Sequence, residues 1–381
     1  MFFSNLRILV PKALRINWIV LIISLLLVAI GSLFLYSAAG GSYDPWSKTQ
    51  MLRYCAGICL FMYVSSVNIR LWLSFSYIIY FISLLLLILV YVIGDIGMGA
   101  QRWLDLGFVR IQPSELMKFS LILLIARYYH SEKEYSSFMR ILSLIYVLVL
   151  VAIPAYLIYI QPDLGGSIIL ILVGITLLFI IGLSIWFFLF SGLCIVLISP
   201  LIWTYFLQDY QQNRILTFLD PSKDPLGAGY HIMQSKIALG SGGFWGRGFM
   251  KGSQSQLNFL PEMQTDFILT LISEEFGMIG TVFILFLYFV LIFYSIIIGL
   301  ISKNIFGSFL CIGIAIILFY SVFINAAMVM GLLPVVGVPL PLISYGGSSL
   351  LSTMFGLGLI SNIYVNRNVT IERYKEGLFG W

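Results

Sequence analysis

Three carboxylates are closely spaced where a polar stretch of the chain runs into a long apolar segment. Within Leu260-Pro261-Glu262-Met263-Gln264-Thr265-Asp266-Phe267-Ile268, Glu262 and Asp266 are four residues apart, and Glu274 follows eight residues later. At these spacings all three can share one face of a helix. Acids at the start of a helix also interact favourably with its dipole, which is the plainer interpretation. Because carboxylates that crowd together or lose water have raised pKa values, Asp266 is predicted to be a general base, with Glu262 supporting it.

A second polar group precedes another apolar segment. Gln101-Arg102-Trp103-Leu104-Asp105 is followed by Gln112-Pro113-Ser114-Glu115-Leu116-Met117-Lys118, in which Glu115 and Lys118 are three residues apart. On a helix these two side chains share a face and could form a structural ion pair. Alternatively, Lys118 and Arg102 neutralise a diphosphate while Glu115 orients Lys118. The sequence leaves both interpretations open.

Three further charged residues are weaker candidates. Asp163, in Gln161-Pro162-Asp163-Leu164-Gly165-Gly166, can cap the helix that follows or serve as a second acid at the site. Arg214 and Lys236 lie in the longest polar stretch, and they are either phosphate or sugar contacts or ordinary solvated charges. The sequence contains no P-loop, no zinc-ligand spacing and no Ser/His/Asp grouping.

The elements that must position these residues are membrane spans. Of the 381 residues, 60% are hydrophobic and only 10% are charged, whereas soluble domains carry about 25% charged residues. The 21 lysines and arginines are scattered in ones and twos, so no nucleic-acid partner is expected. All four cysteines (Cys55, Cys59, Cys194 and Cys311) fall in apolar runs and are expected to be core residues.

Runs of about 20 apolar residues predict transmembrane helices. Ten such runs are found, at 18–37, 51–67, 71–93, 113–129, 140–160, 164–182, 184–207, 265–300, 306–330 and 345–365. The predicted fold is an all-α polytopic membrane protein with ten transmembrane helices, forming a single domain over 1–381. The long connection at 208–264, between spans 7 and 8, is expected to be an ordered cap because apolar and aromatic residues recur in it. The segment 334–349, rich in proline and glycine, is expected to be irregular and to line the same cavity.

The charges predict the orientation of the spans. If the termini at 1–17 and 366–381 lie inside, the inner segments hold 11 of the 21 lysines and arginines: Arg7, Lys12, Arg15, Arg70, Arg127, Lys133, Arg140, Lys303, Arg367, Arg373 and Lys375. This excess favours two cytoplasmic termini. The other 12 of the 16 acidic residues then fall on the outer side or at the outer ends of spans. The candidate site and the 208–264 loop are therefore predicted to be extracytoplasmic.

Five segments, in this order, resemble the SEDS family of bacterial shape, elongation, division and sporulation proteins. They are GAQRWLDLGFVRIQPSELMK at 99–118, QPDLG at 161–165, QNRILTFLDPSKDPLGAGYHIMQSKIALGSGG at 212–243, QSQLNFLPEMQTDFI at 254–268 and LPVVGVPLPLISYGGSS at 333–349. The resemblance implies an essential aspartate at Asp266, in a motif that begins with Thr265. It also implies functional roles for Arg102, Trp103, Glu115, Lys118 and Asp163.

The same resemblance implies a ten-span peptidoglycan glycosyltransferase of the bacterial inner membrane that extends glycan strands from lipid II. The implied partners are lipid II and the nascent glycan strand, both linked to undecaprenyl diphosphate, a class B penicillin-binding transpeptidase, and other elongation-complex proteins. The charge on the leaving diphosphate would be balanced by Arg102, Lys118, Arg214 or Lys236, or by a divalent cation such as Mg²⁺ or Mn²⁺. The residues do not decide between these sources of positive charge.

Two other functions compete with this interpretation: a lipid II flippase or transporter, and a non-catalytic scaffold for a penicillin-binding protein. Transporters typically place their binding residues near the bilayer midplane, between inverted repeats. Here the ionisable residues crowd the outer ends of the spans, and no repeat is evident. The sequence therefore favours the enzyme.

Overall fold

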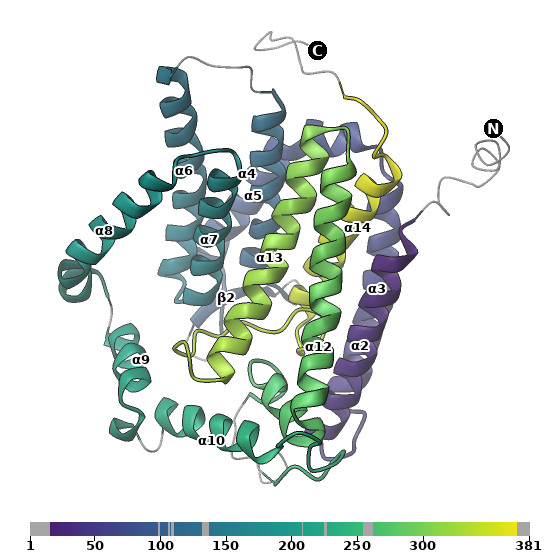
Figure 1. The fold of residues 1–381 in the computed structure, drawn as a ribbon, viewed down its shortest axis with the longest axis vertical. Helices are drawn as coiled ribbons and strands as arrows, with labels where there is room; N and C mark the ends of the chain where they lie inside the picture. Colours follow the sequence, from purple (N-terminus) through teal and green to yellow (C-terminus); the bar gives the residue numbers. More distant parts are fainter. Residues whose placement is uncertain are drawn as a thin grey trace, which may run out of the picture.

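The computed structural model describes residues 16–97, 100–105, 107, 110–131, 137–207, 209–224, 227–253 and 262–371. The segments 1–15, 254–261 and 372–381 lie outside this part, and so do six of the cations used above to predict orientation: Arg7, Lys12, Arg15, Lys133, Arg373 and Lys375. Within the described part, the long helices stand side by side in one bundle (Figure 1).

Each predicted span overlaps a helix of the structure. The helices are α2 (Trp18–Ala38), α3 (Trp46–Ser66), α4 (Ile69–Ile93), α5 (Pro113–Ser131), α6 (Ser137–Ile160), α7 (Leu164–Ile180), α8 (Ile185–Leu201), α12 (Ile268–Ile301), α13 (Ile305–Val329) and α14 (Gly347–Val365). In the described part of the chain, six helices are long and apolar enough to cross a membrane: α2, α4, α6, α12, α13 and α14. Two more, α7 and α8, are apolar but shorter. The protein is therefore a multi-pass membrane protein.

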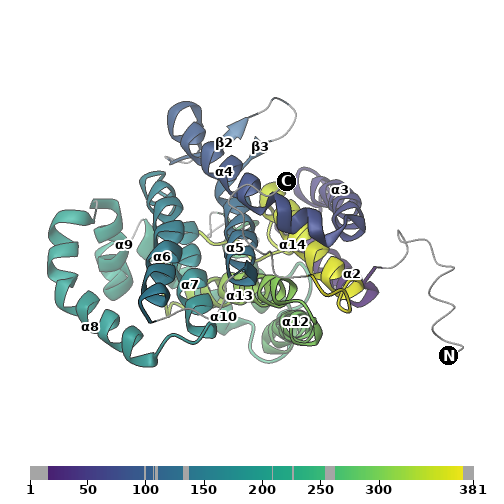
Figure 2. The same ribbon diagram turned by 90° about the horizontal axis from the view of Figure 1, so that it is seen from above.

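Close helix contacts in the bundle depend on small residues. α3 and α14 pack along each other, and a Cβ atom added to Gly57 or Gly358 would lie 2.9 Å from Met354 Cγ or Val64 Cβ, respectively. Small residues at such contacts let membrane helices approach closely. By contrast, α8 stands at the edge of the bundle (Figure 2) and exposes apolar side chains on several faces, as expected of a helix surrounded by lipid.

The beginning of α2 and the end of α14 lie at the same end of the bundle, opposite α10 (Figure 1). The backbone N–H of Asn17 donates a hydrogen bond to Ser361 Oγ at 2.9 Å, which ties the two helices together there. The backbone N–H of Lys303, in the turn between α12 and α13, donates to the carbonyl of Arg367 at 2.9 Å. A chain whose first helix begins and whose last helix ends on the same side of a membrane crosses that membrane an even number of times. The shared position of the start of α2 and the end of α14 is therefore consistent with an even number of spans.

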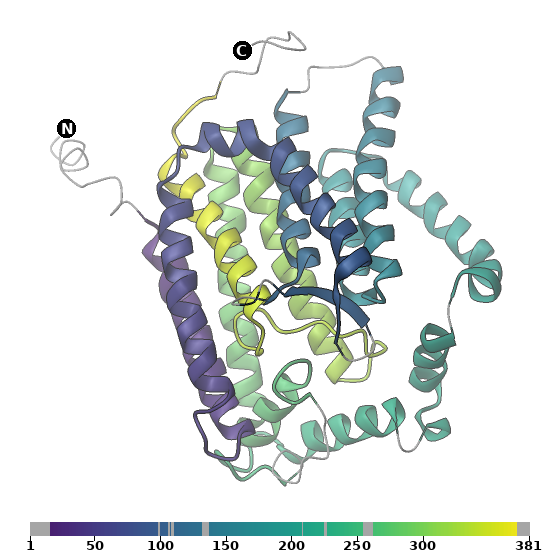
Figure 3. The ribbon, with the colours of Figure 1, turned by 180° about the vertical axis from the view of Figure 1, so that it is seen from behind.

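A small sheet departs from the all-α architecture predicted from the sequence. Strands β1 (Asp95–Gly97), β2 (Ala100–Asp105) and β3 (Arg110–Ile111) pair antiparallel in that order, and β2 crosses one side of the bundle (Figure 3). Asp105 Oδ1 accepts a hydrogen bond from the backbone N–H of Gly107 at 2.7 Å, and Arg110 Nε lies 3.0 Å from Asp105 Oδ2. The bond from Gly107, and then Arg110, lower the pKa of Asp105. The strands are too short for an alternating pattern to reveal them, yet they fix the position of Arg102 and Trp103.

The long connection is helical over much of its described part. It contains α9 (Asp209–Leu219), a short 3-10 helix (Pro221–Lys223) and α10 (Ala228–Ser241), and α9 and α10 lie at one end of the bundle (Figure 1). A π-helix (Ile202–Phe206) continues α8 toward α9. Turns at 242–250 then follow α10 and contact α12.

α12 is broken at Gly277, whose φ of 65° and ψ of −161° are not helical. The turns at 242–248 fill the break with backbone hydrogen bonds of 2.9–3.3 Å: Arg247 N–H to Glu274 O, Gly248 N–H to Glu275 O, Met278 N–H to Gly243 O and Ile279 N–H to Phe244 O. Groups released from the helix are thereby paired again, as they must be in a lipid environment. The prediction that Glu262, Asp266 and Glu274 share one helical face is wrong, because 262–267 form turns before α12 begins, and Glu274 lies near Ser253.

Gly277→Ala is expected to destabilise the protein by about 2 kcal/mol or more. The backbone conformation at this position is one that only glycine adopts readily, and a Cβ atom would lie 2.6 Å from the carbonyl oxygen of Phe244. Thermal unfolding in detergent measures the effect. Gly192→Ala in α8 is the matched control, because a Cβ atom there would have no neighbour within 4 Å and alanine favours the helix. Equal unfolding temperatures for the two variants would contradict the expectation.

Candidate active site

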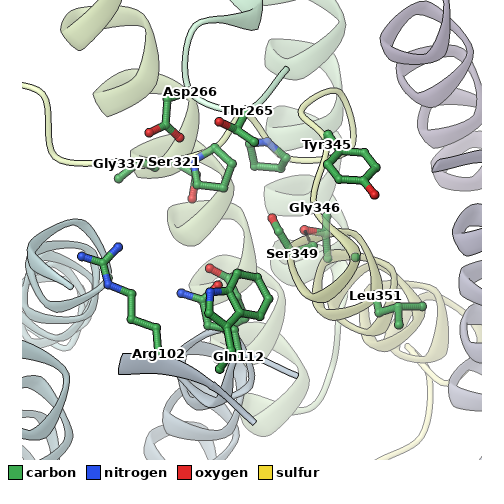
Figure 4. A pocket seen from close by; sticks show the side chains of 18 of the residues that line it. Arg102, Gln112, Thr265, Asp266, Ser321, Gly337, Tyr345, Gly346, Ser349 and Leu351 are labelled. Carbon is green, nitrogen blue, oxygen red and sulfur yellow. Dashed lines mark hydrogen bonds between the residues drawn. The ribbon is translucent and has the colours of Figure 1, made fainter. Parts of the chain in front are cut away.

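One cavity of about 1420 Å³ brings together most of the residues selected from the sequence. Nine of the ten line it: Arg102, Trp103, Glu115, Lys118, Asp163, Arg214, Glu262, Thr265 and Asp266. They come from β2, α5, α9, the turn before α7 and the turns before α12. The irregular segment before α14 supplies another part of the wall, from Val335 to Pro339, as predicted. Figure 4 shows Asp266 and Arg102 on facing walls, with their charged groups directed into the space between them.

Asp266 lies two residues before α12, outside the membrane-spanning helix, and its side chain is partly buried in the cavity wall. The pKa of Asp266 is raised from 3.8 to about 6, first by burial and then by the negative charge of the neighbouring Glu262 carboxylate. Arg102 and Arg214 oppose this rise through their positive charges, while Asp163 adds a smaller increase. A carboxyl group with this pKa is ionised at neutral pH and is a stronger base than an ordinary aspartate.

Glu262 and Thr265 form a short turn that leads to Asp266. Thr265 Oγ1 donates hydrogen bonds to Glu262 Oε2 at 3.0 Å and to the Glu262 carbonyl at 3.2 Å. Glu262 has a positive φ of 59°, which is uncommon for a residue with a side chain. Both residues face the same cavity as Asp266, so they are placed to support it.

Glu115 and Lys118 form the ion pair that the sequence left as one of two interpretations. Lys118 Nζ lies 2.7 Å from Glu115 Oε1, and the two residues are only 6% and 8% exposed. Ser352 Oγ of α14 donates to Glu115 Oε2 at 3.2 Å. Both charged residues also line the cavity, so the pair combines a structural contact with access to a bound ligand.

Asp163 caps a helix, as one of its two interpretations predicted, and it also lines the cavity. Its Oδ1 accepts a hydrogen bond from the backbone N–H of Gly166 at 3.0 Å, which caps α7, and its Oδ2 accepts from Gln112 Nε2 and Ser114 Oγ, each at 3.2 Å. The residue is only 4% exposed, yet it lines the cavity. Asp163 therefore joins the start of α5 to the start of α7 at the site.

Arg102 is held by the turn that precedes Asp163. Its guanidinium donates hydrogen bonds to the backbone carbonyls of Gln161, at 3.4 Å, and Pro162. These contacts place a fixed positive charge opposite Asp266. Trp103 lies beside Arg102 in β2 and also lines the cavity.

The two candidate cations of the long connection, Arg214 and Lys236, lie in different places. Arg214, on α9, lines the cavity, and its positive charge lowers the pKa of Asp266. Lys236, on α10, is exposed, and its Nζ lies 2.7 Å from the position that a Cβ atom on Gly331 would occupy. The structure therefore places Lys236 over Gly331, apart from the residues that line the cavity.

Arg53 was not among the site residues selected from the sequence, although it lies in the predicted span 51–67. α3 begins at Trp46, two turns before Arg53, and the Arg53 guanidinium carbon lies 4.7 Å from the centre of the Tyr345 ring. Both residues line the cavity. The polar residues Lys48, Thr49 and Gln50 hid the start of this helix from a search for apolar runs. An arginine near the end of a predicted span could still have indicated a site residue.

A divalent cation was one of the sources of positive charge that the sequence left open. In the part of the chain that the structure describes, no group of three or more His, Cys, Asp or Glu residues could hold a metal ion.

Comparisons with known proteins identify the family and the fold of the chain. The sequence family described as "Cell cycle protein", named for FtsW, RodA and SpoVE, matches residues 13–369. The chain is 41% identical over 352 residues to the peptidoglycan glycosyltransferase MrdB of Escherichia coli K12, covering 92% of this chain and 93% of that protein. It is 35% identical to the stage V sporulation protein E of Bacillus subtilis, covering 91% of this chain and 96% of that protein.

Solved structures show the same fold. A chain from a peptidoglycan synthase complex that coordinates polymerisation and crosslinking superimposes with a TM-score of 0.80 at 30% identity, covering 93% of this chain and 99% of that one. The rod shape determining protein RodA of Thermus thermophilus superimposes with a TM-score of 0.70 at 26% identity, covering 94% and 99% of the two chains. The segments that resembled the SEDS family are therefore parts of a match along nearly the whole length, and this chain belongs to the FtsW, RodA and SpoVE family.

Proposed function

We propose that the chain is a peptidoglycan glycosyltransferase that polymerises lipid II into glycan strands during cell elongation and so maintains rod shape. The observation that carries this proposal is the Asp266 carboxylate, with its pKa raised to about 6, facing Arg102 across a large cavity. A base opposite fixed cations is suited to a transfer in which a hydroxyl loses a proton and a phosphate group leaves. The relatives named as peptidoglycan glycosyltransferases support the choice of substrate.

In the proposed reaction, an Asp266 carboxylate oxygen takes the proton of the acceptor hydroxyl of lipid II. The hydroxyl oxygen attacks the anomeric carbon of the growing strand, and the bond from that carbon to the diphosphate oxygen breaks. Undecaprenyl diphosphate leaves with the electron pair, and the anomeric configuration inverts. General-base assistance of this kind contributes about 10²–10⁴-fold to the rate.

Positive charge at the cavity is proposed to stabilise the leaving diphosphate. Arg102, Arg214 and Lys118 line the cavity, whereas Lys236 lies apart from it. Arg102 is already held by two backbone carbonyls, so it needs little reorganisation as negative charge develops on the diphosphate. Glu115 keeps Lys118 oriented, and Asp163, Trp103, Glu262 and Thr265 support the substrate-binding wall.

We further propose that the chain is a single membrane domain with ten spans in the bacterial inner membrane. Both termini would lie in the cytoplasm, and the 208–264 loop and the cavity would lie on the outer side. The shared position of the start of α2 and the end of α14 supports this arrangement, and so does the excess of cations in the predicted inner segments. The proposed partners are a class B penicillin-binding transpeptidase and other elongation-complex proteins, by analogy with the similar chain from a peptidoglycan synthase complex.

The direct test uses purified protein, labelled lipid II in detergent, and gel separation of the products. Glycan polymer is expected, and the assay should be repeated with the cognate transpeptidase present. Absence of polymer under both conditions would contradict the proposal. A parallel assay in vesicles measures movement of lipid II between leaflets, and movement without polymer would support a flippase instead.

The polymerisation rate is expected to fall as the pH is lowered through about 6, by about tenfold per unit below it. The Asp266 carboxyl has a raised pKa of about 6, and its protonated form cannot accept the acceptor proton. The groups whose charges act on it are Glu262, Asp163, Arg102 and Arg214. Because Arg214 lowers the pKa of Asp266, Arg214→Gln should move the acid limb of the pH–rate profile to higher pH.

Lys251→Gln is the matched control for this measurement, since it removes an exposed positive charge that does not line the cavity. Its acid limb should coincide with that of the parent. An acid limb that stays in place in Arg214→Gln, or one that moves equally in both variants, would show that Asp266 is not the titrating group.

A further inference from the structure

Three consecutive backbone carbonyls, of Gln264, Thr265 and Asp266, each accept a hydrogen bond from a group far along the chain. The backbone N–H of Tyr345 donates to Gln264 O at 2.8 Å, Ser344 Oγ donates to Thr265 O at 2.6 Å, and Asn325 Nδ2 donates to Asp266 O at 3.0 Å. The accepting residues precede α12 and form turns, so helix bonds do not fix them. These three donors therefore tie the turns that carry Asp266 to distant parts of the chain.

Asn325 is the most constrained of the donors. It lies on α13 with no exposed surface, and its Nδ2 also donates to the carbonyl of Val338 at 2.7 Å. Since both neighbours are carbonyl oxygens, only the amide nitrogen can face them, and this fixes the orientation of the side chain. The single amide group thus joins the backbone of Asp266 to the backbone of Val338.

That junction sets the surroundings of the Asp266 carboxylate. Gly337, which precedes Val338, has a φ of 74°, and a Cβ atom there would lie 3.5 Å from Asp266 Oδ2. The carboxylate therefore lies against the backbone that Asn325 holds. A shift of either carbonyl would move the carboxylate relative to this part of the cavity wall.

The other donors belong to a segment that is itself held firmly. Ser344 Oγ accepts a hydrogen bond from the backbone N–H of Leu340 at 2.8 Å. Gln50 of α3, which is fully buried, donates through Nε2 to Ser344 O at 3.0 Å and to Leu342 O at 3.4 Å. The segment 338–345 is thus a fixed support for the turns that carry Asp266.

We propose that Asn325 is a positioning residue for the glycosyl transfer: by holding the Asp266 and Val338 carbonyls together, its amide sets the place of the Asp266 carboxylate, and Ser344 secures the adjoining Thr265. The inference rests on the proposed polymerase function. Asn325 touches no reacting atom in this scheme and acts only through Asp266. A displacement of about 1 Å at a reacting group can lower a rate about 10²-fold, so loss of this amide should act mainly on the chemical step.

The test compares Asn325→Leu with Asn362→Leu. Asn362, on α14, is a matched control because it is equally buried and does not line the cavity. Its Nδ2 donates to the carbonyls of Val64, at 2.9 Å, and Ser65, at 3.2 Å, in α3. Both variants should have lower unfolding temperatures. Only Asn325→Leu should lower kcat of the folded protein, by about 10–100-fold, with KM for lipid II within about threefold of the parent.

The pH–rate profile supplies a readout that a loss of stability alone would not change. Release of the backbone should let water reach the carboxylate, so the acid limb of Asn325→Leu should move below that of the parent, while Asn362→Leu should keep the parental profile. Ser344→Ala removes one bond from the same support and should lower kcat by about 3–10-fold. If Asn325→Leu does not fold, the kcat of Ser344→Ala tests the support of Asp266 instead.

Equal kcat values and equal pH profiles for Asn325→Leu and Asn362→Leu would overturn the positioning role, provided that the parent makes polymer. A parent that makes no polymer would instead overturn the proposed function on which this inference rests. The two failures are therefore distinguished by the parental reaction.

Discussion

Asp266→Asn is expected to lower the rate of lipid II polymerisation by at least 10²-fold, and by up to about 10⁴-fold, without loss of the folded protein. Asparagine has almost the same size as aspartate but cannot accept a proton at neutral pH. The backbone bond from Asn325 to the residue 266 carbonyl does not involve the side chain, so the turn should keep its shape. Labelled lipid II and purified variants measure the rate, and Asp44→Asn, an exposed carboxylate outside the cavity, is the control.

The same substitution should raise the unfolding temperature at neutral pH. The folded-state pKa of Asp266 is raised from 3.8 to about 6, so the ionised carboxylate is less favourable in the folded protein than in the unfolded chain. Removal of this charge should stabilise the protein by up to about 3 kcal/mol above pH 6, and the gain should vanish below about pH 4. A variant that loses both activity and stability would point to a structural role for Asp266 instead.

Lys118→Met should produce the second large effect, a loss of about 3–5 kcal/mol in folding stability. The substitution leaves the buried Glu115 carboxylate without the ammonium group that lies 2.7 Å away, and an unpaired buried charge is strongly destabilising. Thermal unfolding and the yield of folded protein in detergent measure the loss. The rate of polymerisation should fall together with the folding stability.

The double variant Glu115→Gln with Lys118→Met separates the two interpretations of this pair. The neutral glutamine can still accept the hydrogen bond that Ser352 Oγ makes with residue 115, so stability should return to within about 1 kcal/mol of the parent. Polymerisation should remain at least tenfold lower, because the positive charge that faces the cavity is absent. Recovery of activity together with stability would assign the pair a structural role only.

The membrane helices could be predicted closely because their length and composition are dictated by the bilayer. The run 18–37 became α2 (Trp18–Ala38), and the run 71–93 became α4 (Ile69–Ile93). α3 was placed five residues too late, because polar side chains at its start are turned inward: Ser47 is 1% exposed and Gln50 is fully buried. Hydropathy alone cannot distinguish such inward-facing residues from a loop.

The candidate site was predictable as a set of residues but not as an arrangement. The residue types and family motifs selected nine of the cavity residues, whereas the argument from a shared helical face was wrong. Helical spacing does not apply to 262–267, because these residues form turns before α12 begins. The support from Asn325 and Ser344 joins residues that are 59 and 79 positions apart. No local pattern in the sequence reveals such partners.

The support of Asp266 by residues near the end of the chain has a consequence for biosynthesis. Ribosomes add about 5–20 residues per second, so Tyr345 is joined to the chain roughly 4–16 s after Asp266. Asn325 is added before Ser344 and Tyr345, so until then the carbonyls of Gln264 and Thr265 lack the donors that they have in the finished protein. The proposed general base is therefore synthesised before the groups that hold its backbone, and the set of donors is complete only when the segment before α14 has been added.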